Sequence, residues 1–62
     1  MNQNLIDSYY CEAKYSDSGQ YFTEDKNLND LKEVVSTHPY LNQSTVKYFV
    51  RFTDGQELQI NN

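Results

Sequence analysis

The sequence predicts a small α+β domain in which a four-stranded antiparallel β-sheet carries one helix on one face. Two segments, residues 6–15 and 45–52, alternate apolar and polar side chains as half-buried strands do, and a glycine-containing turn follows each of them. Between them lies the one segment with helical spacing, whose apolar stripe consists of Leu28, Leu31, Val34 and Val35. The order is therefore ββ-α-ββ, in a single domain of residues 1–62.

The first hairpin begins with the strand over residues 6–15, in which alternation places Cys11 on the core face and Tyr10 on the opposite face. Residues 16–19 are typical of a turn, in which Gly19 can adopt the left-handed conformation. The second strand follows over residues 20–24. Because neighbouring strand residues point to opposite faces, one of the two aromatic residues at positions 21 and 22 must lie away from the core.

The helix begins after Asn27, a favourable N-cap residue, and Asp30 lies in its first turn, where the helix dipole favours a negative charge. It ends before Pro39, because proline disfavours the helical conformation of the residue that precedes it. The predicted span is residues 28–37, and a connecting loop over residues 39–44 leads into the next strand.

The second hairpin has a register that the residue pattern can decide. A two-residue turn at Asp54 and Gly55 would set apolar residues opposite polar ones, whereas a three-residue loop with Gly55 in the left-handed conformation keeps each face consistent. That loop predicts three cross-strand pairs, which are Val50 with Leu58, Tyr48 with Ile60, and Arg51 with Glu57.

The chain is short for a stable domain. A chain of this size buries only about 60% of its unfolded surface, and the single cysteine, Cys11, excludes an intrachain disulfide. Cys11 and His38 lack the further ligands that a zinc site requires. We therefore expect a homodimer without metal or cofactor. The rings of Tyr10 and Phe49, on the sheet face opposite the helix, are candidates for its interface.

The net charge of −4, from nine acidic and five basic side chains, disfavours direct binding of nucleic acid. No stretch has the length of a membrane span and the N-terminus lacks the features of a signal peptide, so we expect a cytoplasmic protein. Both glycines lie in predicted turns, which leaves no phosphate-binding loop, and no side chains form a catalytic constellation. The sequence therefore predicts a binding protein and not an enzyme.

Carboxylates gather in the central third of the chain, at Asp17, Glu24, Asp25, Asp30 and Glu33. On a helix, side chains three or four positions apart lie about 5–6 Å from each other, similar to the separation of successive charges on a nucleic-acid strand. A surface of this kind could occupy the basic groove of a DNA-binding enzyme.

Several short motifs resemble the small uracil-DNA glycosylase inhibitors of podoviral Bacillus phages. The matching residues are Gln3, Asn4, Asp7-Ser8-Tyr9, Gly19, Gln20-Tyr21-Phe22, Lys26, Leu28-Asn29-Asp30-Leu31 and Val34. The order of the predicted elements is also similar over roughly residues 1–52. Residues 54–62 have no counterpart in that family.

This resemblance implies a homodimeric DNA mimic that blocks the host's uracil-DNA glycosylase in the host cytoplasm. It also implies that the helices of two protomers line a hydrophobic groove, which captures the apolar residue that the enzyme inserts into DNA. Leu31 and Val35 match the groove positions, with aliphatic side chains where the family has aromatic ones, and Lys32 stands at an acidic position beside Glu33. The implied partner-binding residues are Glu24, Asp25, Asp30, Leu31, Lys32, Glu33 and Val35.

Three alternatives stay open at the level of sequence. Leu31 and Val35 can be core residues beneath the helix. The acidic surface can mimic DNA toward another host enzyme, such as a nuclease, a restriction enzyme or a CRISPR effector. The chain can also be an intracellular interaction module that recruits a peptide at a sheet edge or on its aromatic face.

Overall fold

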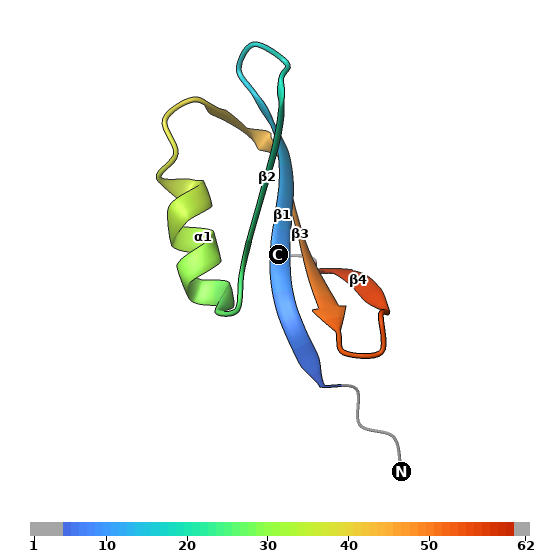
Figure 1. Cartoon of the computed structure of the whole chain (residues 1–62). Coiled ribbons are helices and arrows are strands. Elements are labelled where there is room, and N and C mark those ends of the chain that lie inside the picture. Colours follow the sequence, from blue (N-terminus) through green and yellow to red (C-terminus); the bar gives the residue numbers. More distant parts are fainter. Residues whose placement is uncertain (1–4, 61–62) are drawn as a thin grey trace.

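The computed structural model describes residues 5–60 and contains four strands and one helix (Figure 1). Their bounds are β1 Ile6–Tyr15, β2 Gln20–Asp25, α1 Leu28–Ser36, β3 Leu41–Phe52 and β4 Glu57–Ile60. The strands form one antiparallel sheet in the order β2-β1-β3-β4. The predicted α+β class and ββ-α-ββ order are confirmed. The molecule is elongated, with extents of 45 × 19 × 17 Å.

The core lies between α1 and one face of the sheet, where the helix packs against β1 and β2 (Figure 1). Its buried residues are Cys11, Ala13, Leu31, Val35, Leu41 and Tyr48. Val34, expected on the same stripe, is 50% exposed. The buried residues of the helix are Leu31 and Val35, so its core-facing stripe is narrower than predicted. The helix is also neither long nor apolar enough to cross a membrane, and residues 5–60 contain no other.

Local signals define the helix as expected. The side chain of Asn27 accepts a hydrogen bond from the backbone N–H of Asp30 at 3.0 Å, which satisfies one of the free donors of the first turn. The last helical residue is Ser36, one residue earlier than predicted, and Thr37 is the C-cap. The N–H of Thr37 donates to the carbonyl of Glu33 at 3.1 Å.

The strand β3 begins at Leu41, so the predicted loop over residues 39–44 is wrong from residue 41 onward. The pairing of β3 with β1 is interrupted, since Glu12 lies opposite Lys47 but Lys14 lies opposite Asn42. Within this bulge the hydroxyl of Thr45 accepts a hydrogen bond from the N–H of Lys14 at 2.9 Å and replaces a ladder carbonyl. An irregularity of this kind has no alternation pattern to reveal it.

The second hairpin has the predicted register, with Val50 opposite Leu58, Tyr48 opposite Ile60 and Arg51 opposite Glu57. Gly55 has a φ of 94°, as the three-residue loop requires. In the first hairpin the residue with positive φ is Ser18, at 78°, and not Gly19. The strand β2 also extends one residue further than expected, to Asp25.

Candidate functional site

Leu31 and Val35, the two helix residues expected to line a binding groove, lie in the core. Leu31 is 1% exposed and Val35 is 0% exposed. They belong to the same buried cluster as Cys11 and Tyr48 of the sheet. They therefore stabilise the fold and leave no surface for a partner in this chain.

The expected acidic residues lie at and after the junction between β2 and α1. Glu24, Asp30 and Glu33 are exposed, whereas Asp25 is half-buried. The carboxylate of Asp25 accepts a hydrogen bond from the N–H of Asn27 at 2.8 Å, which orders the chain as it enters the helix. Within residues 5–60, Asp25, Asp30 and Glu33 form no ion pair. Asp30 and Glu33, both exposed on α1, are thus the carboxylates best placed to meet a basic partner.

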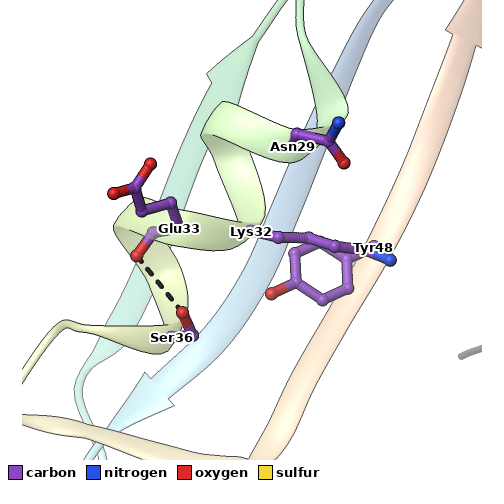
Figure 2. A pocket seen from close by; sticks show the side chains of 5 residues that line it. All are labelled: Asn29, Lys32, Glu33, Ser36 and Tyr48. Atoms are coloured by element: carbon purple, nitrogen blue, oxygen red, sulfur yellow. Dashed lines mark hydrogen bonds between the residues drawn. The ribbon is translucent and has the colours of Figure 1, made fainter.

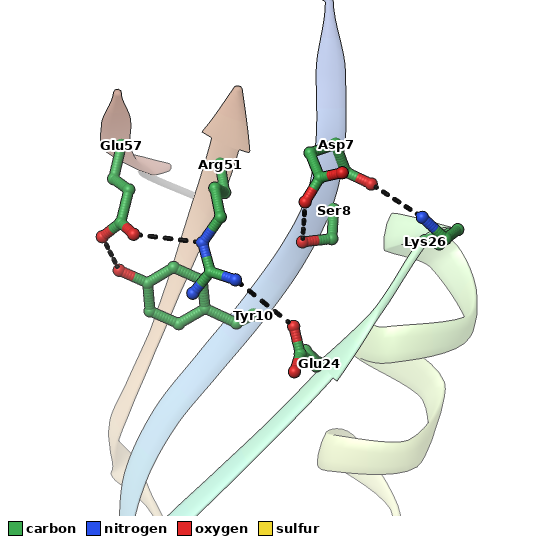
Figure 3. Close-up of polar contacts among 7 residues, drawn as sticks. All are labelled: Asp7, Ser8, Tyr10, Glu24, Lys26, Arg51 and Glu57. Carbon is green, nitrogen blue, oxygen red and sulfur yellow. Dashed lines mark hydrogen bonds and ion pairs between the residues drawn. The ribbon is translucent and has the colours of Figure 1, made fainter. Parts of the chain in front are cut away.

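Strand pairing brings one further carboxylate to this end of the molecule. Asp7 joins Glu24 and Asp25 around a hollow of about 230 Å³, together with Ser8 and Lys26. The ammonium of Lys26 donates to the backbone carbonyl of Asp7 at 3.3 Å (Figure 3). Asp7 was not predicted as a site residue, because only the pairing of β1 with β2 reveals its place beside Glu24.

An open groove of about 690 Å³ runs between α1 and β3. It is lined by Asn29, Lys32, Glu33, Ser36 and Tyr48. Figure 2 shows the side chain of Lys32 extending across the ring of Tyr48, and its ammonium lies 5.7 Å from the ring centroid. Asn29, Lys32, Glu33 and Ser36 share one helix face because they are three or four positions apart. Lys32 and Glu33 thus border a groove that their spacing alone could not locate.

The sheet face opposite the helix carries a cluster of three aromatic rings. The rings of Tyr10 and Phe49 are stacked with centroids 4.8 Å apart, and Phe22 lies 5.4 Å from Tyr10. The guanidinium of Arg51 covers the Tyr10 ring at 5.1 Å. The sequence prediction that Tyr10, Phe49 and one of residues 21 and 22 share this face is confirmed, and that residue is Phe22.

A polar network closes the edge of this aromatic cluster (Figure 3). The hydroxyl of Tyr10 donates to Glu57 at 2.6 Å, and Nε of Arg51 donates to the other carboxylate oxygen at 3.1 Å. The hydrogen bond to Glu57 and burial raise the pKa of Tyr10 to about 12. The hydrogen bonds from Tyr10 and Arg51 lower the pKa of Glu57. Arg51 also reaches Glu24 at 3.6 Å, which links β4 to β2 across the sheet.

This network changes which aromatic side chain a second protomer could contact. Tyr10 is only 6% exposed beneath Arg51, and Phe49 is half-buried. Phe22 is 54% exposed and is the accessible ring of the cluster. The dimer interface at Tyr10 and Phe49 stays a prediction. Phe22, which the sequence alone could not distinguish from Tyr21 on this face, is the ring best placed for such a contact.

Residues 5–60 bring no three histidine, cysteine or carboxylate side chains together in a way that could hold a metal ion. Cys11 is buried, and burial raises the pKa of its thiol.

Comparison of the chain with protein-family models, with curated proteins and with solved structures finds no match. The chemistry that the described site offers is thus an acidic surface beside a groove.

Proposed function

We propose that this chain is a DNA-mimicking protein inhibitor of a uracil-DNA glycosylase, and that it acts by binding and not as an enzyme. The sequence resemblance described above supports the choice of target. The observation that carries the proposal is the pair of exposed carboxylates on α1, Asp30 and Glu33, of which Glu33 borders the groove between α1 and β3. An inhibitor of such an enzyme needs both features.

The carboxylates would occupy the basic surface on which the enzyme binds the phosphates of DNA. Asp30 and Glu33 are exposed on the helix and have no cation partner within residues 5–60. The molecule is 45 Å long, which is somewhat more than one turn of B-DNA at about 34–36 Å. Charges of this sign steer the encounter with a basic partner and raise the rate of association.

The groove would receive the apolar side chain that a base-flipping enzyme inserts into DNA. We assign this role to the groove between α1 and β3 and no longer to Leu31 and Val35. Its floor is the ring of Tyr48, which is 6% exposed beneath the side chain of Lys32, so an entering apolar side chain would displace Lys32 from the ring. Burial of an apolar side chain there would lengthen the lifetime of the complex.

The proposal includes a homodimer. Leu5, Ile6 and Leu58 are 61%, 50% and 59% exposed. Ile6 and Leu58 lie on the helix side of the sheet, beyond the strands that the helix covers, because they pair with Phe52 and Val50. We propose this surface as the dimer interface in place of Tyr10 and Phe49, because a second copy that covers it would supplement a core that is small for an independent domain.

The test is uracil excision from a uracil-containing oligonucleotide by a bacterial uracil-DNA glycosylase, with and without the chain in slight excess. We expect inhibition that saturates at a fixed ratio of chain to enzyme. The same assay with a restriction nuclease measures selectivity. Unimpaired excision, even with the chain in large molar excess over the enzyme, would refute the proposed target.

A further inference from the structure

Tyr40 has an exposure that the fold does not explain. It lies in the connection between α1 and β3 and is 69% exposed, more than any other aromatic side chain of residues 5–60. Exposed tyrosines are enriched among the residues that contribute most to binding. The connection lies at the same end of the molecule as the turn between β1 and β2, far from the start of α1 (Figure 1).

The surroundings of Tyr40 form a small hollow of about 230 Å³, lined by Tyr15, Ser16, Asp17 and Tyr40. Two aromatic side chains and one carboxylate therefore meet in one place. The volume is below the roughly 300–1,000 Å³ that is usual for small-molecule sites. It suits a single side chain of another protein better than a cofactor.

The hollow is held in shape by the backbone. The N–H and the hydroxyl of Ser16 both donate to the carbonyl oxygen of Tyr40, at 2.8 and 3.0 Å. The imidazole of His38 makes edge-to-face contacts with both rings, with centroids 5.7 Å from Tyr15 and 6.2 Å from Tyr40. The N–H of Tyr40 donates to Nδ1 of His38 at 3.3 Å. The hairpin turn and the α1–β3 connection are thus fixed relative to each other before any ligand binds.

The carboxylate of Asp17 gives the hollow a negative charge, which favours a cationic ligand. One oxygen of Asp17 accepts a hydrogen bond from the N–H of Gly19 at 3.0 Å. Within residues 5–60, Asp17 forms no ion pair. A guanidinium group combines the two properties that such a site rewards, because it stacks on aromatic rings and hydrogen-bonds a carboxylate through its planar fork.

We propose that the hollow at Tyr15, Asp17 and Tyr40 is a binding site for an arginine side chain exposed on the surface of a partner protein. The site lies apart from the carboxylates at the start of α1, so it provides a second point of attachment for a basic partner. It does not depend on the partner being a glycosylase, since it is defined by the charge and shape of the hollow alone.

The experiment is an NMR titration of the ¹⁵N-labelled chain with N-acetyl-L-arginine methylamide. The matching citrulline derivative has the same shape without the charge, and the lysine derivative has the charge without the planar fork. We expect saturable shifts of the backbone signals of residues 15–19 and 40 with arginine, weaker ones with lysine and none with citrulline. Equal shifts with citrulline, or shifts centred on α1, would overturn the proposal.

Two variants test the residues directly. Asp17→Asn retains an oxygen for the N–H of Gly19, and Tyr40→Leu removes an exposed ring. Each should weaken arginine binding by about fivefold or more, and Tyr40→Phe should retain it.

The matched control is Asp54→Asn. Asp54 accepts the same local hydrogen bond, from Gln56 at 3.0 Å, in the other hairpin turn. Its substitution should leave arginine binding unchanged. An affinity unaltered by Asp17→Asn in a chain with an otherwise unchanged spectrum would overturn the assignment. Because this titration uses no enzyme, its outcome is independent of the inhibition assay.

Discussion

Ser18 occupies in the first hairpin the backbone position that Gly55 occupies in the second. Both residues have positive φ, 78° for Ser18 and 94° for Gly55. Their N–H groups donate to equivalent carbonyls, Ser18 to Tyr15 at 2.9 Å and Gly55 to Phe52 at 3.0 Å. The preceding aspartate accepts a hydrogen bond from the following residue in both turns. The same three-residue loop is thus built twice, once with a residue that opposes its conformation.

Replacing Ser18 by glycine should stabilise the fold. The left-handed conformation costs a residue with a Cβ about 1–2 kcal/mol, and the greater freedom of glycine in the unfolded chain offsets part of the gain. We expect a net gain of roughly 0.5–1 kcal/mol in the free energy of unfolding. Thermal unfolding should register it as a rise in Tm of about 4–8 °C per kcal/mol.

The matching test in the second turn is Gly55→Ala, which adds a Cβ at a position with positive φ. It should lower the free energy of unfolding by about 1 kcal/mol. A Cβ at Gly55 meets no atom within 4 Å, so the loss reports the backbone conformation and not a clash. Denaturant unfolding of both variants compares the two turns. A Ser18→Gly variant that is less stable than the parent would show that the first turn does not need positive φ in solution.

The two hairpins also show what the sequence could predict. The second was predictable to the register because Arg51 and Glu57 have opposite charges and because Asp54-Gly55 has one arrangement that keeps Val50 and Leu58 on one face. The first turn has a serine beside a glycine, and the rule that glycine takes the left-handed position selects the wrong residue. The alternation of apolar and polar residues thus predicts the register of a hairpin. It does not predict which of two adjacent turn residues, here Ser18 or Gly19, adopts positive φ.

The candidate site was less predictable than the fold, for a physical reason. The spacing of Leu31 and Val35 fixes the helix face that they share, but it cannot distinguish a face that meets the sheet from one that meets a partner. Asp7 reaches its hollow through the pairing of β1 with β2, and Tyr48 borders the groove because α1 packs over the sheet, and no pattern within one segment shows either contact. Conversely, Asp30 was predictable, because its place in the first helical turn follows from Asn27 alone.

Truncation of helix residues should separate core from surface. Leu31→Ala removes a side chain that is 1% exposed, and we expect a loss of about 2–4 kcal/mol in the free energy of unfolding. Val34→Ala removes one that is 50% exposed, and its effect should stay within about 0.5 kcal/mol. Urea unfolding measures both. Equal effects would place Leu31 outside the core and restore it as a candidate for partner binding.

Removing the hydroxyl of Tyr10 should destabilise the fold in a pH-dependent way. The folded pKa of Tyr10 lies at about 12, above its ordinary value of 10.0, so the contribution is complete below pH 10.0 and is lost as pH rises toward 12. Glu57 has a lowered pKa, so its contribution is present above its ordinary value of 4.5 and is lost as pH falls through its folded pKa. The stability difference between the parent and Tyr10→Phe should therefore be largest between these limits.

Denaturant unfolding between pH 3 and pH 11, a range chosen to bracket roughly the ordinary carboxyl and phenol pKa values, measures this difference. Ser8→Ala is a suitable control, since Ser8 is also buried on β1 but its hydroxyl donates to Asp7, at 3.5 Å, and not to Glu57. A difference between parent and Tyr10→Phe that does not vary with pH would show that the bond to Glu57 does not form in solution.

Substitution of Leu58 should test the proposed dimer. Leu58→Lys places a charge on the uncovered helix side of the sheet, where Leu58 is 59% exposed. If a second copy covers this surface, burial of the charge should shift the chain to a monomer in sedimentation equilibrium. Val34→Lys, at a similarly exposed position on the helix, should leave the dimer intact. A parent chain that sediments as a monomer would refute the dimer directly.

Neutralising the helix carboxylates should slow the association of the chain with a glycosylase more than it hastens dissociation. Asp30→Asn with Glu33→Gln removes two exposed charges that have no ion pair within residues 5–60. We expect the association rate at low salt to fall by roughly three- to tenfold and to depend less on ionic strength, because exposed charges act mainly on the encounter. Stopped-flow binding measures the two rates separately. Asp54→Asn, which removes an exposed charge from the turn between β3 and β4, serves as the control for net charge. If Asp54→Asn slowed association as much per charge, general electrostatic attraction would explain the effect, and the helix carboxylates would have no special place in the complex.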